Sequence, residues 1–197
     1  MEVFNVHKVM RSIFKDRISI NYKHLSNKIV NYGEGDLKEL VKIISNKESK
    51  YPFLWLKHDF QTPVPLTKGV TRLDVDLDFL ILVDGSKNDL YYKRFEDKYE
   101  NIIYPIIEAF LEVINLEKGV KVLYDQNDAY SLVSDYPFND TNSFDLSKDE
   151  TSAINTVWDA TTFPISLRFN PSCFKEVNSC NNKLNKYIIN EKIKNNE

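Results

Sequence analysis

Hydrophobic and polar residues alternate most strictly between positions 73 and 83. Every odd position there is apolar, whereas the even positions carry Asp74, Asp76 and Asp78 and then two leucines. Successive side chains of a strand point to opposite faces, so a period of two predicts a long strand with one buried face. Its other face is predicted to be acidic at the start and apolar at the end.

Two N-terminal segments show instead the three- and four-residue spacing of amphipathic helices. The first lies within residues 2–16, and the second is expected to begin at Asp36. Asp36 and Glu39 have the spacing of a capping box, in which each side chain accepts a hydrogen bond from the other residue's backbone N–H. Between the two helices, NYGEG (residues 31–35) is expected to be a loop because it contains two glycines.

A longer helix is expected over residues 94–116, with a kink or break at Pro105, because proline lacks a backbone donor and clashes one turn back. In the last predicted strand, Pro164 indicates a sheet edge or the first residues of the strand. Apart from residues 73–83, aromatic content and alternation predict strands over residues 51–60, 120–124, 129–136 and 161–169.

The predicted order of elements indicates an α+β fold, a mainly antiparallel sheet with helices packed on one face. The length of 197 residues suits one domain, which we assign to residues 1–180, N-terminal helices included. Residues 137–152 are polar and are expected to form a loop. Residues 181–197 are assigned to a C-terminal arm that contains a short apolar helix.

Composition excludes several classes of function. Twenty-six basic residues face 29 acidic ones, so the basic excess of a nonspecific nucleic-acid binder is missing. No apolar run reaches the ~18–20 residues of a membrane span, and the N-terminus lacks the apolar region of a signal peptide. We therefore expect a soluble protein made in a cytoplasm, with Cys173 and Cys180 as free thiols.

The aspartate row is the strongest candidate for chemistry. Carboxylates on one strand face can hold Mg²⁺ for phosphoryl transfer, and DVDLDFLIL resembles the metal-binding strand of nucleotidyltransferases. The Gly-Ser turn that those enzymes place about ten residues upstream is missing here, since only Gly69-Val70 lies nearby. The alternative is a half-exposed strand that presents its solvated face, and we favour it.

Other side chains give weaker signals. His58 next to Asp59 is not a catalytic dyad, because neighbours on a strand point to opposite faces. Three histidines and two cysteines show no zinc-ligand spacing, and no phosphate-binding or nucleophile motif occurs. No catalytic residue, cofactor or metal is therefore predicted. Aromatic residues are assigned to the core or to a subunit interface, namely Tyr51, Trp55, Tyr91, Tyr92 and Trp158.

One string of features resembles a known group of proteins. Two helices lead into YPFLWL, followed by the alternating strand, a helix containing IIYPIIEAF, then GVKVLYD and DATTFPISLRFNPSCF. Over residues 40–175 this order is similar to the small neck and tail-completion (tail-terminator-like) proteins of tailed bacteriophages, particularly the Bacteroidetes (crAss-like) type. The loop over residues 137–152 and the long tail depart from the compact pattern of that group.

The resemblance implies a non-enzymatic virion protein that forms a homo-oligomeric ring of six or twelve copies between portal and tail. Such a ring would contact the portal or adjacent neck and tail proteins and let DNA pass without specific binding. Asp74, Asp76 and Asp78 would then line the channel and repel phosphates. Two alternatives remain, a cytoplasmic adaptor or immunity-type binding module and a Mg²⁺-dependent nucleotidyltransferase-like enzyme that uses the three aspartates.

Overall fold

The computed structural model describes residues 4–21, 28–45, 51–58, 72–84, 90–124, 131–136, 158–174 and 187–190. Three subjects of the sequence predictions lie outside these residues: the loop over residues 137–152, Asp59, which follows His58, and Cys180. Cys173 is described and is a free, exposed thiol, as expected from the sequence.

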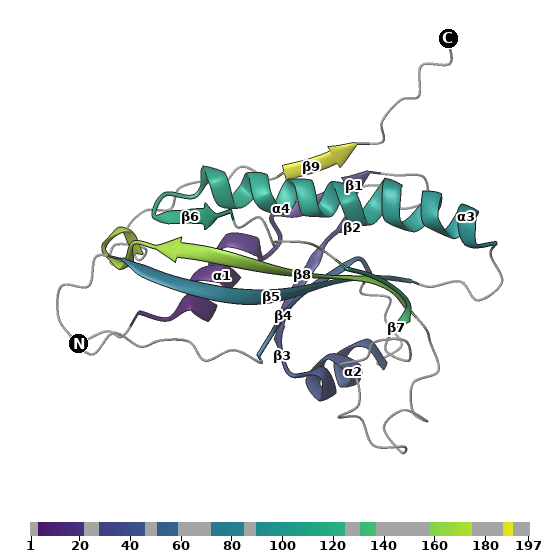
Figure 1. Ribbon diagram of the computed structural model, residues 1–197, viewed down its shortest axis with the longest axis horizontal. Coiled ribbons are helices and arrows are strands. Elements are labelled where there is room, and N and C mark those ends of the chain that lie inside the picture. The colour runs from purple at the N-terminus through teal and green to yellow at the C-terminus, as the bar shows by residue number, and fades with distance from the viewer. Residues whose placement is uncertain are drawn as a thin grey trace, which may run out of the picture.

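Helices and strands are both well represented, which establishes the α+β class (Figure 1). The helical elements are α1 (Val6–Phe14), α2 (Leu37–Ser45), α3 (Tyr91–Arg94), the π-helix η1 (Phe95–Ile103), α4 (Tyr104–Leu116) and the 3₁₀ helix η3 (Pro171–Phe174). The strands are β1 (Ile18–Asn21), β2 (Lys28–Ile29), β3 (Asn31–Gly35), β4 (Phe53–Lys57), β5 (Leu73–Asp84), β6 (Val120–Leu123), β7 (Ser131–Tyr136), β8 (Trp158–Phe169) and β9 (Tyr187–Asn190).

A long antiparallel ribbon of β5 and β8 forms the centre of the larger sheet. The two strands pair along their full lengths, from Leu73 opposite Phe169 to Asp84 opposite Trp158. The odd positions of β5 are buried, whereas Asp74, Asp76 and Asp78 are exposed. The strand predicted over residues 73–83 and its two-faced character are therefore confirmed.

The position of β8 inside the sheet corrects the edge assignment that Pro164 indicated. The sheet has the order β3-β4-β5-β8-β6, with β7 also paired to β8. On the side of β8 away from β5, residues 158–162 pair with β7 and residues 166–169 pair with β6. Pro164 falls between the segment of β8 that pairs with β7 and the segment that pairs with β6. A residue without an N–H is therefore tolerated in the middle of an interior strand.

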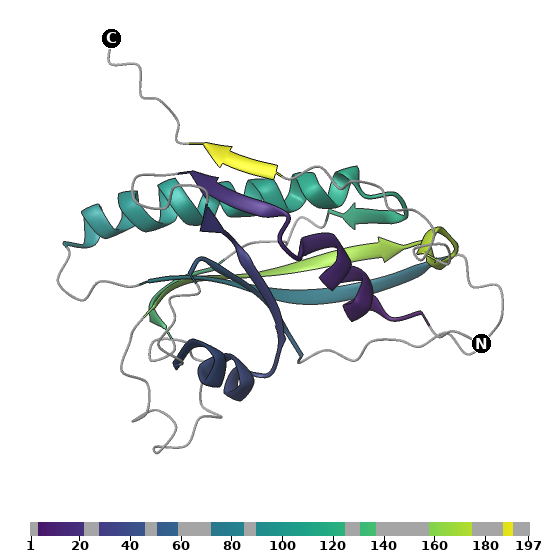
Figure 2. The same cartoon turned by 180° about the vertical axis from the view of Figure 1, so that it is seen from behind.

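The segment NYGEG is strand β3 rather than the predicted loop. It pairs in parallel with β4, with Gly33 opposite Trp55. A Cβ on Gly33 would lie 2.6 Å from the ring of Trp55, so the glycine leaves the space that the indole fills. The chain runs from β2 directly into β3 and so joins the larger sheet to a smaller one of order β2-β1-β9 (Figure 2).

The main core lies between the larger sheet, α1 and α4. Phe110 of α4 stacks on Phe14 of α1, with ring centroids 4.6 Å apart and planes at 3°. The same ring meets Phe79 of β5 and Phe163 of β8 edge-on, at 4.7 Å and 5.2 Å. One aromatic cluster therefore ties the N-terminal helix and the long helix to the central ribbon.

Helix α2 covers the opposite face of the sheet, so the helices do not all share one face as predicted. Its Leu40 is buried against Trp55, Leu80 and Trp158. The predicted capping box is present, because Asp36 accepts from the N–H of Glu39 at 2.7 Å and Glu39 accepts from that of Asp36 at 3.0 Å. The apolar end of the outer face of β5 is therefore covered, and its acidic start is not.

The interruption predicted at Pro105 is a change of helix type. η1 has π geometry up to Ile103, α4 begins at Tyr104, and the N–H of Tyr104 donates to the carbonyl of Tyr99. Because Pro105 has no N–H and its ring crowds the carbonyl four residues earlier, a wider turn before it relieves both problems.

The C-terminal arm enters the fold as a strand, not as the predicted helix. Of residues 181–197, the structure describes Tyr187–Asn190, which form β9 and pair in parallel with β1 from Ile18 to Asn21. The arm thus adds a strand to the smaller sheet. Figure 1 draws β9 beside α4, on the side away from β8.

Candidate functional site

The three aspartates of β5 lie on the open face of the sheet, and two of them have partners across the β5–β8 pair. Asp74 accepts two hydrogen bonds from the guanidinium of Arg168, from Nε at 2.7 Å and from an Nη at 2.8 Å. Arg72 also lies 3.6 Å from Asp74. The start of the acidic row is therefore neutralised by arginine rather than held open for a cation.

The remaining members of the row face equally ordinary neighbours. Asp76 accepts from the hydroxyl of Ser166 at 2.6 Å, and Asp78 lies opposite Pro164. Among the described residues, the three carboxylates do not form a group of converging metal-ligand atoms. Their arrangement matches the solvated strand face that we favoured over a magnesium site.

Two of the five candidate interface aromatics belong to the interior of the chain. Trp55 and Trp158 are 1% and 0% exposed, and Tyr51 packs against the same cluster under α2. The indole of Trp55 donates to the carbonyl of Gly35 at 3.0 Å. Trp55 and Trp158 therefore fill the second core and offer no ring to another subunit, whereas Tyr51 is only partly buried. Tyr92 is 63% exposed, and the side chain of Tyr91 lies outside the described residues.

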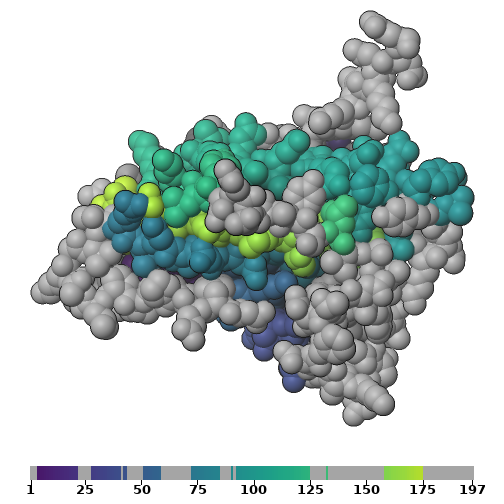
Figure 3. All heavy atoms as spheres, in the orientation of Figure 1, coloured from purple at the N-terminus to yellow at the C-terminus, as the bar shows by residue number. Residues whose placement is uncertain are grey.

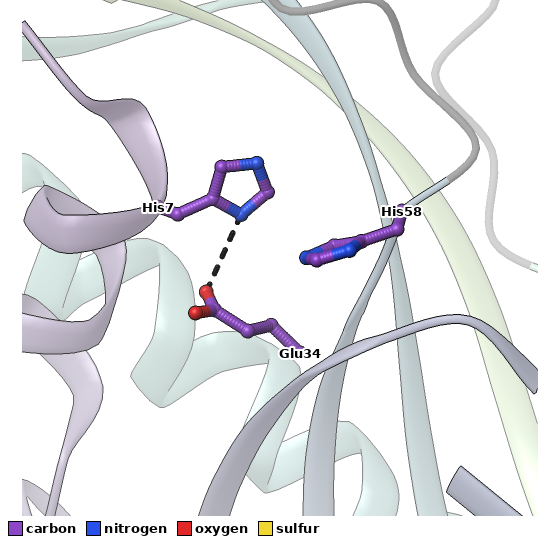
Figure 4. A group of neighbouring side chains, drawn as sticks. All are labelled: His7, Glu34 and His58. Atoms are coloured by element: carbon purple, nitrogen blue, oxygen red, sulfur yellow. Dashed lines mark ion pairs between the residues drawn. The ribbon is translucent and has the colours of Figure 1, made fainter. Parts of the chain in front are cut away.

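A different cluster forms where α1 crosses β3 and β4. His7 of α1, Glu34 of β3 and His58, which follows β4, turn their side chains toward one another (Figure 4). The parallel register sets Glu34 beside Leu56, and His58 continues the ladder by donating its N–H to Gly35 at 3.1 Å. With a side-chain period of two, Glu34, Leu56 and His58 share the face on which α1 packs.

The donor atoms of this cluster converge closely. One ligand atom from each of the three side chains can be chosen so that all lie within 4.8 Å of one another. His7 Nδ1 is 3.4 Å from Glu34 Oε2, and the two imidazole rings meet edge to face with centroids 4.6 Å apart. The other carboxylate oxygen of Glu34 is ion-paired with Arg11, which lies one turn along α1 from His7.

Burial and charge set the protonation of the cluster. Burial is the main reason that the pKa of His7 lies below its ordinary value of 6.5. Glu34 opposes this shift, whereas the neighbouring His58 and Arg11 add to it. Burial, followed by the charge of Glu34, also raises the pKa of Tyr32, whose hydroxyl donates to Glu34 at 3.5 Å. At neutral pH the cluster therefore presents a neutral imidazole at His7 beside the Glu34 side chain.

Local sequence pattern contains little signal for this grouping. Its members belong to a helix, to a segment expected to be a loop and to a strand end, so no fixed spacing connects them. Assignment of NYGEG to a strand parallel to β4 would have set Glu34 and His58 side by side. The position of His7 depends on how α1 docks, which local pattern does not determine.

A second charged group lies inside the core and holds the start of the long helical segment. Asp159 of β8 is 0% exposed and accepts from Arg94 Nε at 2.7 Å, and a second guanidinium nitrogen lies 2.6 Å from its other oxygen. The hydroxyl of Tyr99 donates to the same carboxylate at 3.2 Å. Both oxygens are thus occupied, which indicates a structural clamp between α3, η1 and β8 rather than a reactive acid.

None of the helices that the structure describes has the length and apolar character needed to cross a membrane. When the chain was compared with protein-family models, curated proteins and solved structures, none of them matched it.

Proposed function

We propose that the chain is a non-enzymatic structural subunit that assembles head to tail into a homo-oligomeric ring in the neck or tail of a bacteriophage. The proposal rests on the resemblance over residues 40–175 and on one structural observation, the distribution of exposed apolar side chains. Leu90 and Tyr92, at the start of the helical rod α3–η1–α4, are 60% and 63% exposed. Leu116, the last residue of α4, is 69% exposed, and Tyr124, just after β6, is 75% exposed.

These residues form two separate surfaces. We assign Leu90 and Tyr92, which precede and begin the rod, to a first surface. We assign Leu116, at the other end of the rod, and Tyr124, which follows β6, to a second surface. A subunit that joins a ring by head-to-tail contacts needs two different complementary surfaces, because each copy contacts its neighbours with opposite sides. Exposed aromatic and aliphatic residues are typical of the centre of such contacts.

The proposal does not depend on the acidic row as a channel lining. Asp74 is paired with Arg168, and the exposed Lys121 of β6 lies opposite Arg168 on the same face. This part of the sheet carries both signs of charge. Such a mixed surface suits either the inner or the outer wall of a ring. Figure 3 shows the sheet and helix surfaces on this side of the molecule.

The test uses one substitution on each surface, Tyr92→Glu and Leu116→Glu. The unsubstituted chain should have the native mass of six or twelve copies, and each variant alone should be a monomer, because a buried charge opposes the contact. Mixed in equal amounts, the variants should form dimers and nothing larger, since each retains the surface that the other has lost.

Leu132→Glu is the matched control, because Leu132 is an exposed leucine on β7 and belongs to neither surface. It should leave the native mass unchanged. A monomeric unsubstituted chain at high protein concentration, absent from phage particles, would overturn the ring and favour the adaptor alternative. A pair of variants that stays monomeric after mixing would overturn the head-to-tail arrangement.

A further inference from the structure

We propose that His7, Glu34 and His58 bind a Zn²⁺ ion, with water as the fourth ligand, and that this ion fastens α1 to the β3–β4 edge of the sheet. The inference is independent of the proposed ring, because it concerns the way one chain is held together. Its basis is the convergence of three ligand atoms within 4.8 Å of one another, from three elements that are far apart in the sequence.

Two of the three ligand atoms already have the spacing of a tetrahedral zinc site. Zinc–ligand distances of about 2.0–2.2 Å in a tetrahedron put neighbouring ligand atoms about 3.3–3.5 Å apart. His7 Nδ1 and Glu34 Oε2 are 3.4 Å apart, which meets that requirement without movement. His58 is exposed and lies at the end of β4, so its ring can approach by rotation about its side-chain bonds while the backbone stays in the ladder.

The surroundings of Glu34 also suit a ligand. Its Oε1 is paired with Arg11, whereas Oε2 is directed toward His7 and also accepts a hydrogen bond from the Tyr32 hydroxyl at 3.5 Å. Carboxylates that bind zinc through one oxygen are commonly held in place by a hydrogen bond to the other. The side chain of Arg11 is 61% exposed, so water screens its repulsion of the ion.

The donor set selects the class of metal. Two imidazoles and one carboxylate with an open position are typical of zinc and of other first-row transition metals, whereas Mg²⁺ and Ca²⁺ require oxygen ligands almost throughout. An imidazole binds a metal ion through its neutral form. An ion bound here would connect α1, β3 and the end of β4 at one point.

The experiment titrates Zn²⁺ into the tag-free full chain after EDTA treatment, in a Cys173→Ser, Cys180→Ser background that removes thiol ligands. We expect one Zn²⁺ per chain and a rise in Tm of about 5–10 °C at a hundredfold excess over Kd. His58→Ala is the main variant, because the exposed His58 is dispensable for the core. It should weaken binding more than about 100-fold, beyond the usual cost of losing an outer-shell partner.

His24→Ala is the matched control, since His24 is the third and last histidine of the chain. It should bind Zn²⁺ as the background does, and Mg²⁺ should leave the Tm of every variant unchanged. Retention of the Zn²⁺ site in His58→Ala, its equal loss in His24→Ala, or no binding to the background protein would each overturn the proposal. None of these outcomes depends on oligomeric state, so the ring can fail while the zinc site stands.

Discussion

Two arginine–aspartate pairs lie on opposite faces of the same β5–β8 ribbon and differ mainly in burial. Asp74 and Arg168 face solvent, with side chains 46% and 29% exposed. Asp159 and Arg94 lie beneath the helical rod, with side chains 0% and 10% exposed. Both pairs are bidentate and have similar distances. Identical chemistry therefore has different consequences, because water competes with the first pair and is excluded from the second.

The difference also shows which kind of acidic residue attracts attention in a sequence. Asp74, Asp76 and Asp78 stand out because they repeat with a period of two, yet they form an ordinary solvated face. No repeat surrounds Asp159 in the sequence, although its carboxylate holds the buried ends of Arg94 and Tyr99. Regularity indicates an exposed face, whereas importance to the fold depends on what covers the side chain.

The largest expected effect comes from breaking the buried pair. Asp159→Ala removes the carboxylate to which the buried guanidinium of Arg94 and the hydroxyl of Tyr99 donate. We expect the free energy of unfolding to fall by about 3–5 kcal/mol, measured by urea denaturation. The double variant Arg94→Met, Asp159→Leu should recover most of that loss, because it removes both charges together. An Asp159→Ala protein as stable as the unsubstituted chain would contradict the clamp.

An intermediate effect is expected at His7, which lies 3.4 Å from the Glu34 carboxylate. The folded-state pKa of His7 lies below 6.5, so the unfolded chain binds more protons near that pH. Stability from this site is therefore present above pH 6.5 and is lost as the pH falls through the folded pKa. The unsubstituted protein should lose more stability than His7→Gln on acidification.

The measurement is the urea midpoint at pH 7.5 and at pH 5.5, with EDTA present so that metal binding does not contribute. His24→Gln should keep the pH dependence of the unsubstituted protein, since it removes a histidine outside the cluster. Equal pH dependence in His7→Gln and the unsubstituted chain would show that the burial of His7 has no energetic consequence.

The smallest effect is expected for the exposed pair. Asp74→Asn should change the free energy of unfolding by no more than about 1 kcal/mol, because exposed ion pairs gain little over hydration. The change should shrink further between low salt and 1 M NaCl, as ions screen the interaction. A loss as large as that of Asp159→Ala would remove the contrast between the two faces.

Local pattern was sufficient for elements whose burial is one-sided. The alternation over residues 73–83, the capping box at Asp36 and Glu39, and the spacing within residues 2–16 each gave the element that the structure contains. Where the environment overrides propensity, the pattern failed. Gly33 fits in strand β3 because the ring of Trp55 fills the space that a side chain at position 33 would occupy. Pro164 is tolerated inside the sheet because β6 and β7 pair with β8 on either side of it.

By itself, the sequence determined the α+β class and the main strand and helix of the core, because periodicity reports which face of an element is buried. Only the tertiary structure decided that α2 covers the second face, that β9 joins β1, and that His7, Glu34 and His58 meet. These contacts join residues distant along the chain. They depend on strand order, register and helix docking, which arise from packing the whole molecule rather than from any local window.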